Sequence, residues 1–417
     1  MDTYKTRIID EIIPRKLRTT GGVLIRGPRF VGKTTTANHH AHSSIRMDES
    51  DAVRQQAILL PKNILNGNTP RLIDEWQLVP SLWNSIRNEI DSRNLKGQFI
   101  LTGSAAPSDD ITMHSGAGRI SRLNLRPMSL YESKESLGEV SLANLFADDC
   151  DISGSGGLNV HEYAEKVVRG GWPALVDIDP VDAQDSLIDY LENLAYVDLR
   201  NMKSPPTPER MTALIRAIAR NIATEASLER LAKESEIYDG PITAQTTRKY
   251  LDQLSQVFVL EELSAWKTHL RSSAQLRIKP KWHFVDPSLA TAALRVTPDM
   301  LIADLNTFGF LFESLVVRDL RVYSDAIDAK VYQYRDSTNL EVDAIVERYD
   351  GKWLAIEVKL GGDKAIEDAV SNFKKLKKRL TKEKLEQLGS FNIITAGEFS
   401  YRRPDGVNVI ALGHLKP

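Results

Sequence analysis

The stretch Gly27-Pro28-Arg29-Phe30-Val31-Gly32-Lys33-Thr34 fits the pattern G-x-x-x-x-G-K-[ST] at every position. It follows the strand-like run Gly22-Val23-Leu24-Ile25-Arg26 and precedes a helix-like segment. A loop between a strand and a helix is where backbone N–H groups wrap phosphates. The stretch therefore predicts a nucleoside triphosphate site. A chance Gly-Lys-Thr turn is the alternative, and the strand-like run before it argues against that reading.

The residue types in this loop indicate separate roles. We expect Lys33 to reach the β and γ phosphates of ATP and Thr34 to bind Mg²⁺. The glycines allow backbone dihedral angles that a Cβ atom would forbid. The complete set of expected nucleotide-binding residues is Gly27, Pro28, Arg29, Phe30, Val31, Gly32, Lys33, Thr34, Thr35, Thr102 and Ser104.

Four further strand-like stretches follow within the first 125 residues, and helix-like spacers separate them. They cover residues 44–47, 71–74, 98–102 and 119–125. Strands that alternate with helices predict a largely parallel sheet, and ligands bind at the carboxyl ends of its strands. The fold class is therefore α/β, with the chemistry expected at those strand ends.

Polar residues end two of these strands. Asp74 and Glu75 follow Leu72-Ile73, about 40 residues after the loop, so we expect Asp74 to hold Mg²⁺ and Glu75 to polarise the attacking water. Thr102 and Ser104 end the next strand, where they either sense the γ-phosphate or cap a turn.

Composition limits the class of protein. A chain of 417 residues exceeds one ordinary core, so two to four domains are expected. No apolar run approaches the roughly 18 residues of a membrane span, and we expect no membrane partner. The single Cys150 excludes an intramolecular disulfide, which favours a cytoplasmic protein. A net charge of −2 neither predicts nor excludes a nucleic-acid partner.

The first third of the chain resembles AAA-type ATPases, and among them a prokaryotic family. The matching stretches are GPRFVGKTT, LIDEWQ, FILTGSA, Ala117-Gly118-Arg119 and RPMSLYE at residues 126–132. The resemblance implies an ATPase core at residues 1–130. It also implies an arginine near the fifth strand that stabilises the transferred phosphate, for which we choose Arg119, with Arg122 as the substitute. Such arginines often come from a neighbouring subunit, so self-association is expected.

The same resemblance places a small helical lid at residues 131–204. The element Arg169-Gly170-Gly171-Trp172-Pro173 would lie in it, with Arg169 as a second nucleotide sensor. A helix end closed by glycine is the alternative. The proline-rich run at residues 204–208 then marks a domain boundary.

Apolar spacing across residues 205–270 predicts a winged helix. Its last helix, residues 243–254, exposes Gln245, Thr246, Arg248 and Lys249, a candidate recognition surface for a DNA groove. Residues 260–266 are the expected wing. Residues 205–280 hold 11 basic and 9 acidic residues, so charge alone does not decide between contacting DNA and packing against a neighbouring domain.

The C-terminal third, residues 271–417, carries a second set of charged residues. In the strand at residues 341–346, Val342, Ala344 and Val346 alternate with Asp343. The following strand, residues 353–360, places Glu357 and Lys359 on one face. A short turn joins the two strands, so antiparallel pairing brings Asp343 beside Glu357. A surface ladder of ion pairs is the alternative to a metal site.

This arrangement resembles the PD-(D/E)xK nuclease fold, although Val342 stands where that motif has proline. The resemblance implies that Asp343 and Glu357 bind Mg²⁺, that Lys359 positions or deprotonates the attacking water, and that Glu313 is the acid contributed by the first helix. The basic run at residues 374–379 is expected to hold a phosphate backbone.

The expected architecture is thus an AAA-type P-loop NTPase domain with a helical lid, a winged-helix domain and a C-terminal α/β restriction-endonuclease-like domain. The leading hypothesis is an ATP-hydrolysing protein whose nucleotide state controls a metal-dependent nuclease-like domain acting on DNA. The alternative is a nucleotide-dependent DNA-binding regulator or scaffold that does not cut. The expected cofactors are ATP and Mg²⁺, and the expected partner is nucleic acid.

Overall fold

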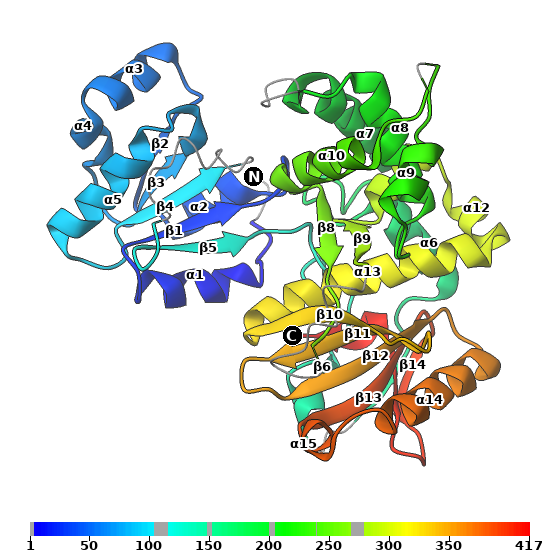
Figure 1. Cartoon of the computed structure of the whole chain (residues 1–417). Helices are drawn as coiled ribbons and strands as arrows, with labels where there is room; N and C mark the ends of the chain where they lie inside the picture. Colours follow the sequence, from blue (N-terminus) through cyan, green and yellow to red (C-terminus); the bar gives the residue numbers. More distant parts are fainter. Residues whose placement is uncertain (1–3, 104–115, 148–151, 200–204, 239, 268–278) are drawn as a thin grey trace. The chain divides into compact units, whose positions relative to one another are not determined.

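The structure is a computed structural model that describes residues 4–103, 116–147, 152–199, 205–238, 240–267 and 279–417. The chain divides into two compact units (Figure 1). The N-terminal unit comprises Met1–Arg126 and Leu254–Val259, and the C-terminal unit comprises Pro127–Gln253 and Leu260–Pro417. No helix in the described part of the chain is long and apolar enough to cross a membrane.

The described residues of the N-terminal unit form a five-stranded parallel sheet in the order β2-β3-β4-β1-β5 (Figure 1). The five strands expected from the sequence are confirmed, each within two residues of its expected limits. The strands are β1 (Gly22–Arg26), β2 (Ser43–Arg46), β3 (Arg71–Asp74), β4 (Phe99–Gly103) and β5 (Ile120–Asn124). The helices are α1 (Ile9–Leu17), α2 (Lys33–His40), α3 (Asp51–Leu59), α4 (Pro61–Leu65) and α5 (Leu82–Arg93).

The core of this unit lies between the sheet and helix α5. Trp76 and Trp83 pack with their ring centroids 5.0 Å apart, and Ile86 and Leu101 are fully buried in the same cluster. Aromatic side chains bury large apolar areas, so this pair contributes strongly to the cluster. The packing fixes the carboxyl ends of β1, β3 and β4, where the predicted ATP site lies.

The C-terminal unit begins with short strands and a helical array. These elements are β6 (Val140–Ser141), β7 (Ser153–Ser155), α6 (Val160–Arg169), α7 (Pro180–Asn193), α8 (Pro208–Arg220), α9 (Leu228–Glu234) and α10 (Ala244–Gln256). An antiparallel pair, β8 (Leu260–Leu263) with β9 (Lys281–Phe284), follows them. Next come α11 (Ser288–Leu294), α12 (Pro298–Ala303) and the 22-residue α13 (Leu305–Ala326).

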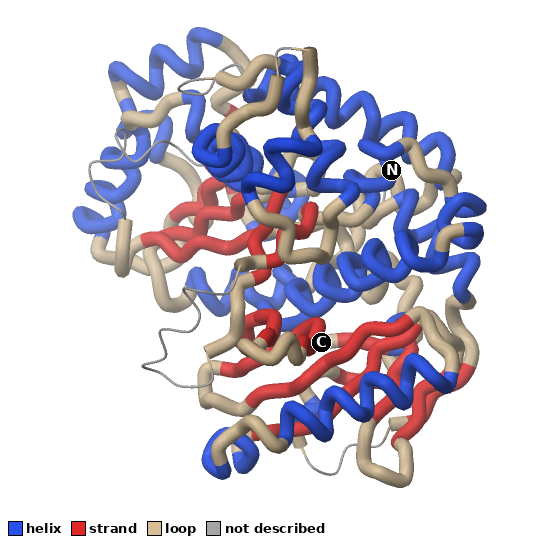
Figure 2. The backbone as a smooth tube through the Cα atoms, turned by 45° about the vertical axis from the view of Figure 1, so that its right-hand side comes forward, coloured by secondary structure: helices blue, strands red, loops and turns tan. Residues whose placement is uncertain are grey.

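A seven-stranded mixed sheet in the order β10-β11-β12-β13-β15-β14-β7 is formed by the described residues of this unit. The remaining strands are β10 (Ala329–Arg335), β11 (Glu341–Arg348), β12 (Trp353–Lys359), β13 (Leu388–Thr395), β14 (Phe399–Arg402), β15 (Asn408–Ala411) and β16 (Leu415–Lys416). Helix α13 packs against β10, β11 and β12, whereas α14 (Asp363–Lys377) packs against β11, β12 and β13. A short α15 (Lys382–Glu386) precedes β13. Figure 2 shows the strands of this sheet side by side near the C-terminus.

The segment expected to form a lid over the ATPase belongs instead to the C-terminal unit, which corrects that prediction. Strand β7 pairs with β14, and β6 pairs with β16. Helix α6 packs against α12 and α13, and Tyr163 meets Phe312 edge to face at 5.3 Å. Because its apolar face is buried there, residues 131–199 are an integral part of the larger unit.

The elements expected for a winged helix appear in the expected order, three helices and then a strand ribbon. Tyr250, Leu251 and Leu254 form the buried face of α10, as the spacing predicted. The second strand of the ribbon, β9, lies beyond residue 270, where we expected the winged helix to end. The ribbon therefore pairs a strand of the expected winged helix with a strand of the expected C-terminal domain. The assignment as a winged helix stays a prediction.

Candidate functional site

The phosphate loop joins β1 to α2, and two glycines set its course. A Cβ atom on Gly27 would lie 2.1 Å from the carbonyl oxygen of Leu125, so only glycine lets the backbone pass there. Gly32 has φ of 94° at the N-terminus of α2. That conformation favours glycine and directs backbone N–H groups into the loop. Arg29 and Phe30 are exposed at its tip.

Lys33 lies folded into this loop and is 6% exposed. Its Nζ donates to the carbonyl oxygens of Gly27 at 3.0 Å and Pro28 at 2.6 Å. Burial lowers the pKa of Lys33 to about 8. Backbone carbonyls compensate only part of the cost of burying an ammonium group. An anion entering the loop would be a stronger partner for Lys33.

Three side chains, from helix α2 and from strands β3 and β4, meet at the predicted Mg²⁺ position. The hydroxyl of Thr34 lies 2.8 Å from Oδ1 and 3.1 Å from Oδ2 of Asp74. Thr102 donates its hydroxyl to the same Oδ1 from β4. Asp74 and Thr102 are buried, at 1% and 0% exposure. Thr102 therefore orients Asp74 in this structure.

Glu75 follows β3 with φ of 52°, an uncommon conformation for a side chain other than glycine. Its N–H donates to Oγ1 of Thr102 at 3.3 Å, and its carboxylate accepts from the side-chain amide of Gln77. Strained backbone is frequent at functional sites. The geometry places Glu75 at the carboxyl edge of the sheet beside Asp74. Ser104, the last expected residue of this group, lies outside the described residues.

Arg119 does not lie at this edge of its own sheet, so its expected role could be filled only from a neighbouring subunit and stays a prediction. Ile120 is the partner of Gly22 in the parallel pairing of β1 and β5, so Arg119 precedes the amino ends of both strands. The phosphate loop leaves from the opposite end of β1. The guanidinium of Arg119 pairs with the exposed Asp91 at 2.7 Å. Arg122 lies midway along β5, level with Leu24.

Arg7 is a residue of this site that the sequence did not reveal. It is 3% exposed, and it donates to the carbonyl oxygens of Val31 at 3.1 Å and Arg126 at 2.6 Å. These bonds tie the phosphate loop to the chain that leaves β5. No motif surrounds Arg7, so only the three-dimensional contacts identify it.

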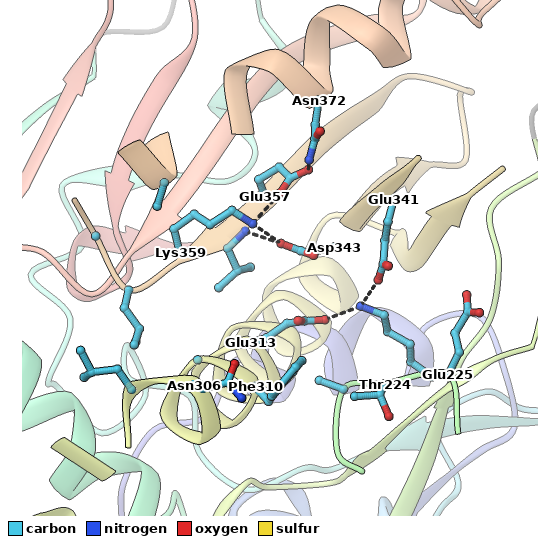
Figure 3. Close-up of a pocket in the computed structure, with 18 of the residues that line it drawn as sticks. Thr224, Glu225, Asn306, Phe310, Glu313, Glu341, Asp343, Glu357, Lys359 and Asn372 are labelled. Carbon is cyan, nitrogen blue, oxygen red and sulfur yellow. Dashed lines mark hydrogen bonds and ion pairs between the residues drawn. The ribbon is translucent and has the colours of Figure 1, made fainter. Parts of the chain in front are cut away.

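A second candidate site is a pocket of about 690 Å³ in the C-terminal unit (Figure 3). Residues from β9, β10, β11, β12, α13, α14 and the segment after α8 line it. That last segment contributes Glu225, which pairs with Arg335 of β10 at 2.6 Å. The helical array and the large sheet thus share the walls of one pocket.

Asp343 and Glu357 converge in this pocket on one ammonium group, as Figure 3 shows. Nζ of Lys359 lies 2.7 Å from Oε2 of Glu357 and 3.4 Å from Oδ2 of Asp343. Asp343 also accepts the backbone N–H of Val358 at 2.7 Å. The pairing of β11 with β12 matches Ala344 with Ile356, so Asp343 and Glu357 are the next cross-strand neighbours.

Strand β11 carries an extra residue beside Asp343 where it pairs with β10. Tyr332 pairs with Ile345 but Tyr334 pairs with Val342. Between these pairs, two residues of β11, Asp343 and Ala344, lie opposite a single residue of β10. This bulge interrupts the simple alternation expected from the sequence, and Ile345 is buried along with Val342. Bulges commonly re-aim side chains next to active sites.

Glu357 is 1% exposed, and burial raises its pKa to about 8. Asn372 of α14 donates to its Oε1 at 3.2 Å, while Lys359 bonds the other oxygen. A buried carboxylate is stable only with such partners. The neighbouring charges of Asp343 and Glu357 raise the pKa of Lys359, which therefore stays cationic.

Glu313 of α13 lies in the same pocket but bonds to a different lysine. Nζ of Lys281 lies 2.8 Å from Oε1 of Glu313 and 2.6 Å from Oε1 of Glu341. Burial raises the pKa of Glu313 to about 7, and Lys281 opposes that rise. Lys281 was missed in the sequence because the stretch Lys279-Pro280-Lys281-Trp282 matches no motif.

The pocket offers two neighbouring carboxylates, Asp343 and Glu357, to a hard divalent ion. Among the described residues, no group of three or more His, Cys, Asp or Glu side chains is arranged to hold a metal. Mg²⁺, however, commonly takes one or two carboxylates and completes its shell with water. Asp343 and Glu357 are two carboxylates that already face one cation, the Lys359 ammonium.

The surfaces expected to contact nucleic acid are exposed, although some of their cationic side chains form ion pairs or ring contacts within the protein. Lys374, Lys375, Lys377 and Lys378 are exposed at the end of α14. Arg248 of α10 pairs with Asp252 at 3.1 Å and lies over the ring of Trp282 at 5.7 Å. Both arrangements leave cationic groups at the surface.

Arg169, the expected second sensor, is committed to another partner. Its Nη2 lies 2.8 Å and 2.7 Å from the two carboxylate oxygens of Glu135, and Lys166 also bonds that group at 2.9 Å. Arg169 is 6% exposed. The guanidinium thus stabilises the interior of the C-terminal unit, which corrects its predicted role.

The geometry of β1, the phosphate loop and Asp74 defines the N-terminal unit as an AAA-type P-loop ATPase domain, and a family profile described as "AAA domain" matches residues 20–134. Profiles described as "Domain of unknown function (DUF8612)" and "Domain of unknown function (DUF4143)" match residues 160–300 and 308–415. The chain is similar to "Uncharacterized protein Rv2008c" of Mycobacterium tuberculosis and "Uncharacterized protein Mb2031c" of Mycobacterium bovis. Each is 24% identical over 354 residues, which cover 83% of this chain and 71% of the relative.

Two solved structures are similar over much of their length. The Walker-type ATPase PABY2304 of Pyrococcus abyssi has a TM-score of 0.41 and 14% identity, covering 71% of this chain and 99% of that one. The Aeropyrum pernix ORC1 protein, solved in complex with DNA, has a TM-score of 0.28 and 10% identity, covering 71% and 92%. These scores are too low to define a common fold for the whole chain.

Proposed function

We propose that this protein hydrolyses ATP and that its nucleotide state controls a metal-dependent nuclease-like domain acting on DNA. One observation carries the second half of the proposal. Asp343 and Glu357, on neighbouring strands, face the ammonium of Lys359 inside a pocket of about 690 Å³. Two acids with an adjacent lysine are the residue types that metal-assisted phosphodiester hydrolysis requires.

The ATPase half rests on residues of the N-terminal unit. Backbone N–H groups of the loop and Lys33 would bind the phosphates, and Thr34 with Asp74 would hold Mg²⁺, which neutralises charge that develops on the phosphates. The Thr34 hydroxyl already contacts Asp74 at 2.8 Å. Glu75, next in the chain, would orient and deprotonate the attacking water.

The nuclease-like half uses the pocket of the C-terminal unit. Asp343 and Glu357 would hold Mg²⁺, which polarises a phosphodiester when bound. Lys359 is 25% exposed and bonds Glu357 at 2.7 Å and Asp343 at 3.4 Å; a bound Mg²⁺ would take over both carboxylates and free its ammonium to hold a water molecule. The exposed lysines of α14 would contact the phosphate backbone.

A DNA partner is favoured by the shared walls of the pocket. Glu225 follows α8 and bonds Arg335 of the large sheet, so the proposed winged helix is attached directly to the proposed cleavage site. DNA held by α10 would therefore be presented near Asp343. Self-association of the ATPase domain is part of the proposal by resemblance alone.

A second function from a different class is a nucleotide-dependent DNA-binding regulator that does not cut. Its support is that both lysines of the pocket are already paired with carboxylates, and that the described residues include no ready three-ligand metal group. In that case the pocket would serve binding or stability.

Cleavage assays separate the two functions. Purified protein is incubated with plasmid, linear and single-stranded DNA in Mg²⁺ or Mn²⁺, with ATP, with a non-hydrolysable analogue and without nucleotide. We expect nucleotide-dependent cutting that Lys359→Ala abolishes. Lys330→Ala changes an exposed lysine of β10 and is the matched control. Absence of cutting, or cutting that Lys359→Ala leaves intact, contradicts the nuclease proposal, and DNA retention without cutting supports the regulator.

A further inference from the structure

Lys281 is the most deeply buried cation of the C-terminal pocket. Its side chain is 3% exposed, compared with 25% for Lys359. It lies at the start of β9 and reaches Glu313 of α13 and Glu341 of β11 (Figure 3 draws both ion pairs as dashed lines). Three elements thus fix one ammonium between two carboxylates.

The charges around the pocket indicate how many further cations it can accept. Five carboxylates line it, against the three cations Lys281, Arg335 and Lys359, and all of these residues are described. With every group in its charged form, which a bound cation favours over the protonated carboxyl groups, the excess is two negative charges, the charge of one divalent ion. Without Lys281 the excess would be three, gathered on the side of Glu313, Glu341 and Asp343.

The geometry points to Lys281 as a built-in cation that takes the place of a second divalent ion, so that the pocket binds one metal ion and not two. This inference rests on the proposed metal-dependent function and specifies its stoichiometry. In two-metal sites the ions lie about 3.5–4 Å apart and share carboxylates. Here, the oxygens that a second ion would need already bond to Lys281, and its positive charge repels another cation.

The two lysines differ in a way that assigns the metal to one side of the pocket. Lys359 bonds Glu357 at 2.7 Å but Asp343 only at 3.4 Å, and its side chain is 25% exposed, so its ammonium can move toward solvent when an ion enters. Lys281 is enclosed and has two close carboxylate partners, and removing a buried ammonium from such partners is costly. The ion would therefore lie beside Asp343 and Glu357.

The test counts bound Mn²⁺ by electron paramagnetic resonance and by calorimetry on the nucleotide-free full-length chain. Sites that disappear in Asp343→Asn are assigned to the pocket. We expect one such ion in the wild type and in Lys281→Arg, which keeps the cation, and two in Lys281→Met. A single ion in a folded Lys281→Met, or two in the wild type, overturns the role of Lys281 while the metal site stands. No Asp343-dependent ion in the wild type overturns the proposed metal site itself.

A second variant covers the case in which Lys281→Met fails to fold, as circular dichroism would show. Glu313→Gln keeps the size of the side chain and removes only its charge. Because Glu313 bonds Lys281 and not the proposed ion, we expect one Asp343-dependent ion to remain, with a dissociation constant within about tenfold of the wild type. Loss of that ion in Glu313→Gln overturns the inference.

Discussion

The hydroxyl of Thr34 lies 2.8 Å from Oδ1 of Asp74, although 40 residues separate the two in the chain. Thr34 lies in the first turn of α2, the helix after β1, and Asp74 ends β3. Their contact at the carboxyl edge of the sheet brings together two oxygen groups of the kind that would bind a nucleotide-bound Mg²⁺ under the proposed function. The ATPase predictions below start from this pair.

Replacing Lys33 with alanine should nearly abolish nucleotide binding. In the wild type, the buried ammonium of Lys33 bonds loop carbonyls and would exchange them for phosphate oxygens when ATP binds. Alanine cannot form these bonds, and hydrogen bonds to charged groups contribute roughly 1.5–3 kcal/mol. We expect ATP affinity to fall by about 10- to 100-fold or more, measured with a fluorescent ATP analogue. Lys62→Ala, an exposed lysine of the same unit, should bind normally. Equal affinities in the two variants would contradict the assigned role.

Replacing Glu75 with glutamine should separate binding from hydrolysis. Glu75 bonds to Thr102 and Gln77, which lie outside the loop, so the dissociation constant for ATP should change little. Loss of a general base lowers the rate by about 10²- to 10⁴-fold. Phosphate release measures the rate, with the exposed Glu49→Gln as control. Unchanged turnover in Glu75→Gln would show that another group activates the water.

Glu313 should make the stability of the C-terminal unit depend on pH. Burial raises its folded-state pKa from 4.5 to about 7, and Lys281, Glu341 and Asp343 are the charged groups facing it. The stabilisation from its protonated form is complete below pH 4.5 and is lost as the pH rises through about 7. Each pH unit in that window changes the free energy of unfolding by at most about 1.4 kcal/mol.

Glu313→Gln should remove this part of the pH dependence. Thermal unfolding of the wild type and the variant from pH 4.5 to 8 provides the measurement. The difference between their melting temperatures should shift in favour of Glu313→Gln as the pH increases. Parallel curves across the whole range would show that the carboxyl group does not titrate there.

Gly171→Ala should destabilise the C-terminal unit strongly. A Cβ atom there would lie 2.0 Å from the carbonyl oxygen of Met128, and the backbone N–H of Gly171 is fixed by Asp286 at 3.0 Å. Since neither backbone can move freely, we expect a loss above about 3 kcal/mol, the range of severe core substitutions. Chemical denaturation measures it.

Gly309→Ala is the matched control for that prediction. Gly309 lies within helix α13, and a Cβ atom would meet nothing within 4 Å. Alanine is favoured over glycine inside helices by roughly 0.5–1 kcal/mol. The control should therefore be slightly stabilised. Equal stabilities of the two variants would contradict the close approach at Gly171.

The sequence was most informative where local pattern and function coincide. Gly27 to Thr34 and Asp74 were found because a phosphate loop and the parallel strands around it impose spacing that can be read along the chain. Asp343, Glu357 and Lys359 were found because two adjacent strands joined by a short turn carry them. In both cases the residues that meet are either close in sequence or held together by the regular pairing of neighbouring strands.

The errors arose where contacts are distant, and strand direction limits the prediction for Arg119. Strand β7 has three residues and pairs with β14 more than 240 positions later, so no local pattern marks it. Lys281 gains its role only because β9, α13 and β11 meet. Arg119 precedes a parallel strand and so lies at the amino edge of its own sheet, and its predicted role at the ATP site of a neighbouring subunit stays a prediction.

The pairing of β7 with β14 affects how this protein can be divided into fragments. A fragment that starts at the proline-rich run near residue 205 lacks β7, and it leaves β14 as an open sheet edge with Phe399 and Tyr401 exposed. Open edges invite aggregation. Soluble expression of the C-terminal unit therefore requires a fragment that begins near residue 127, or two co-expressed pieces that reassemble through this strand pair.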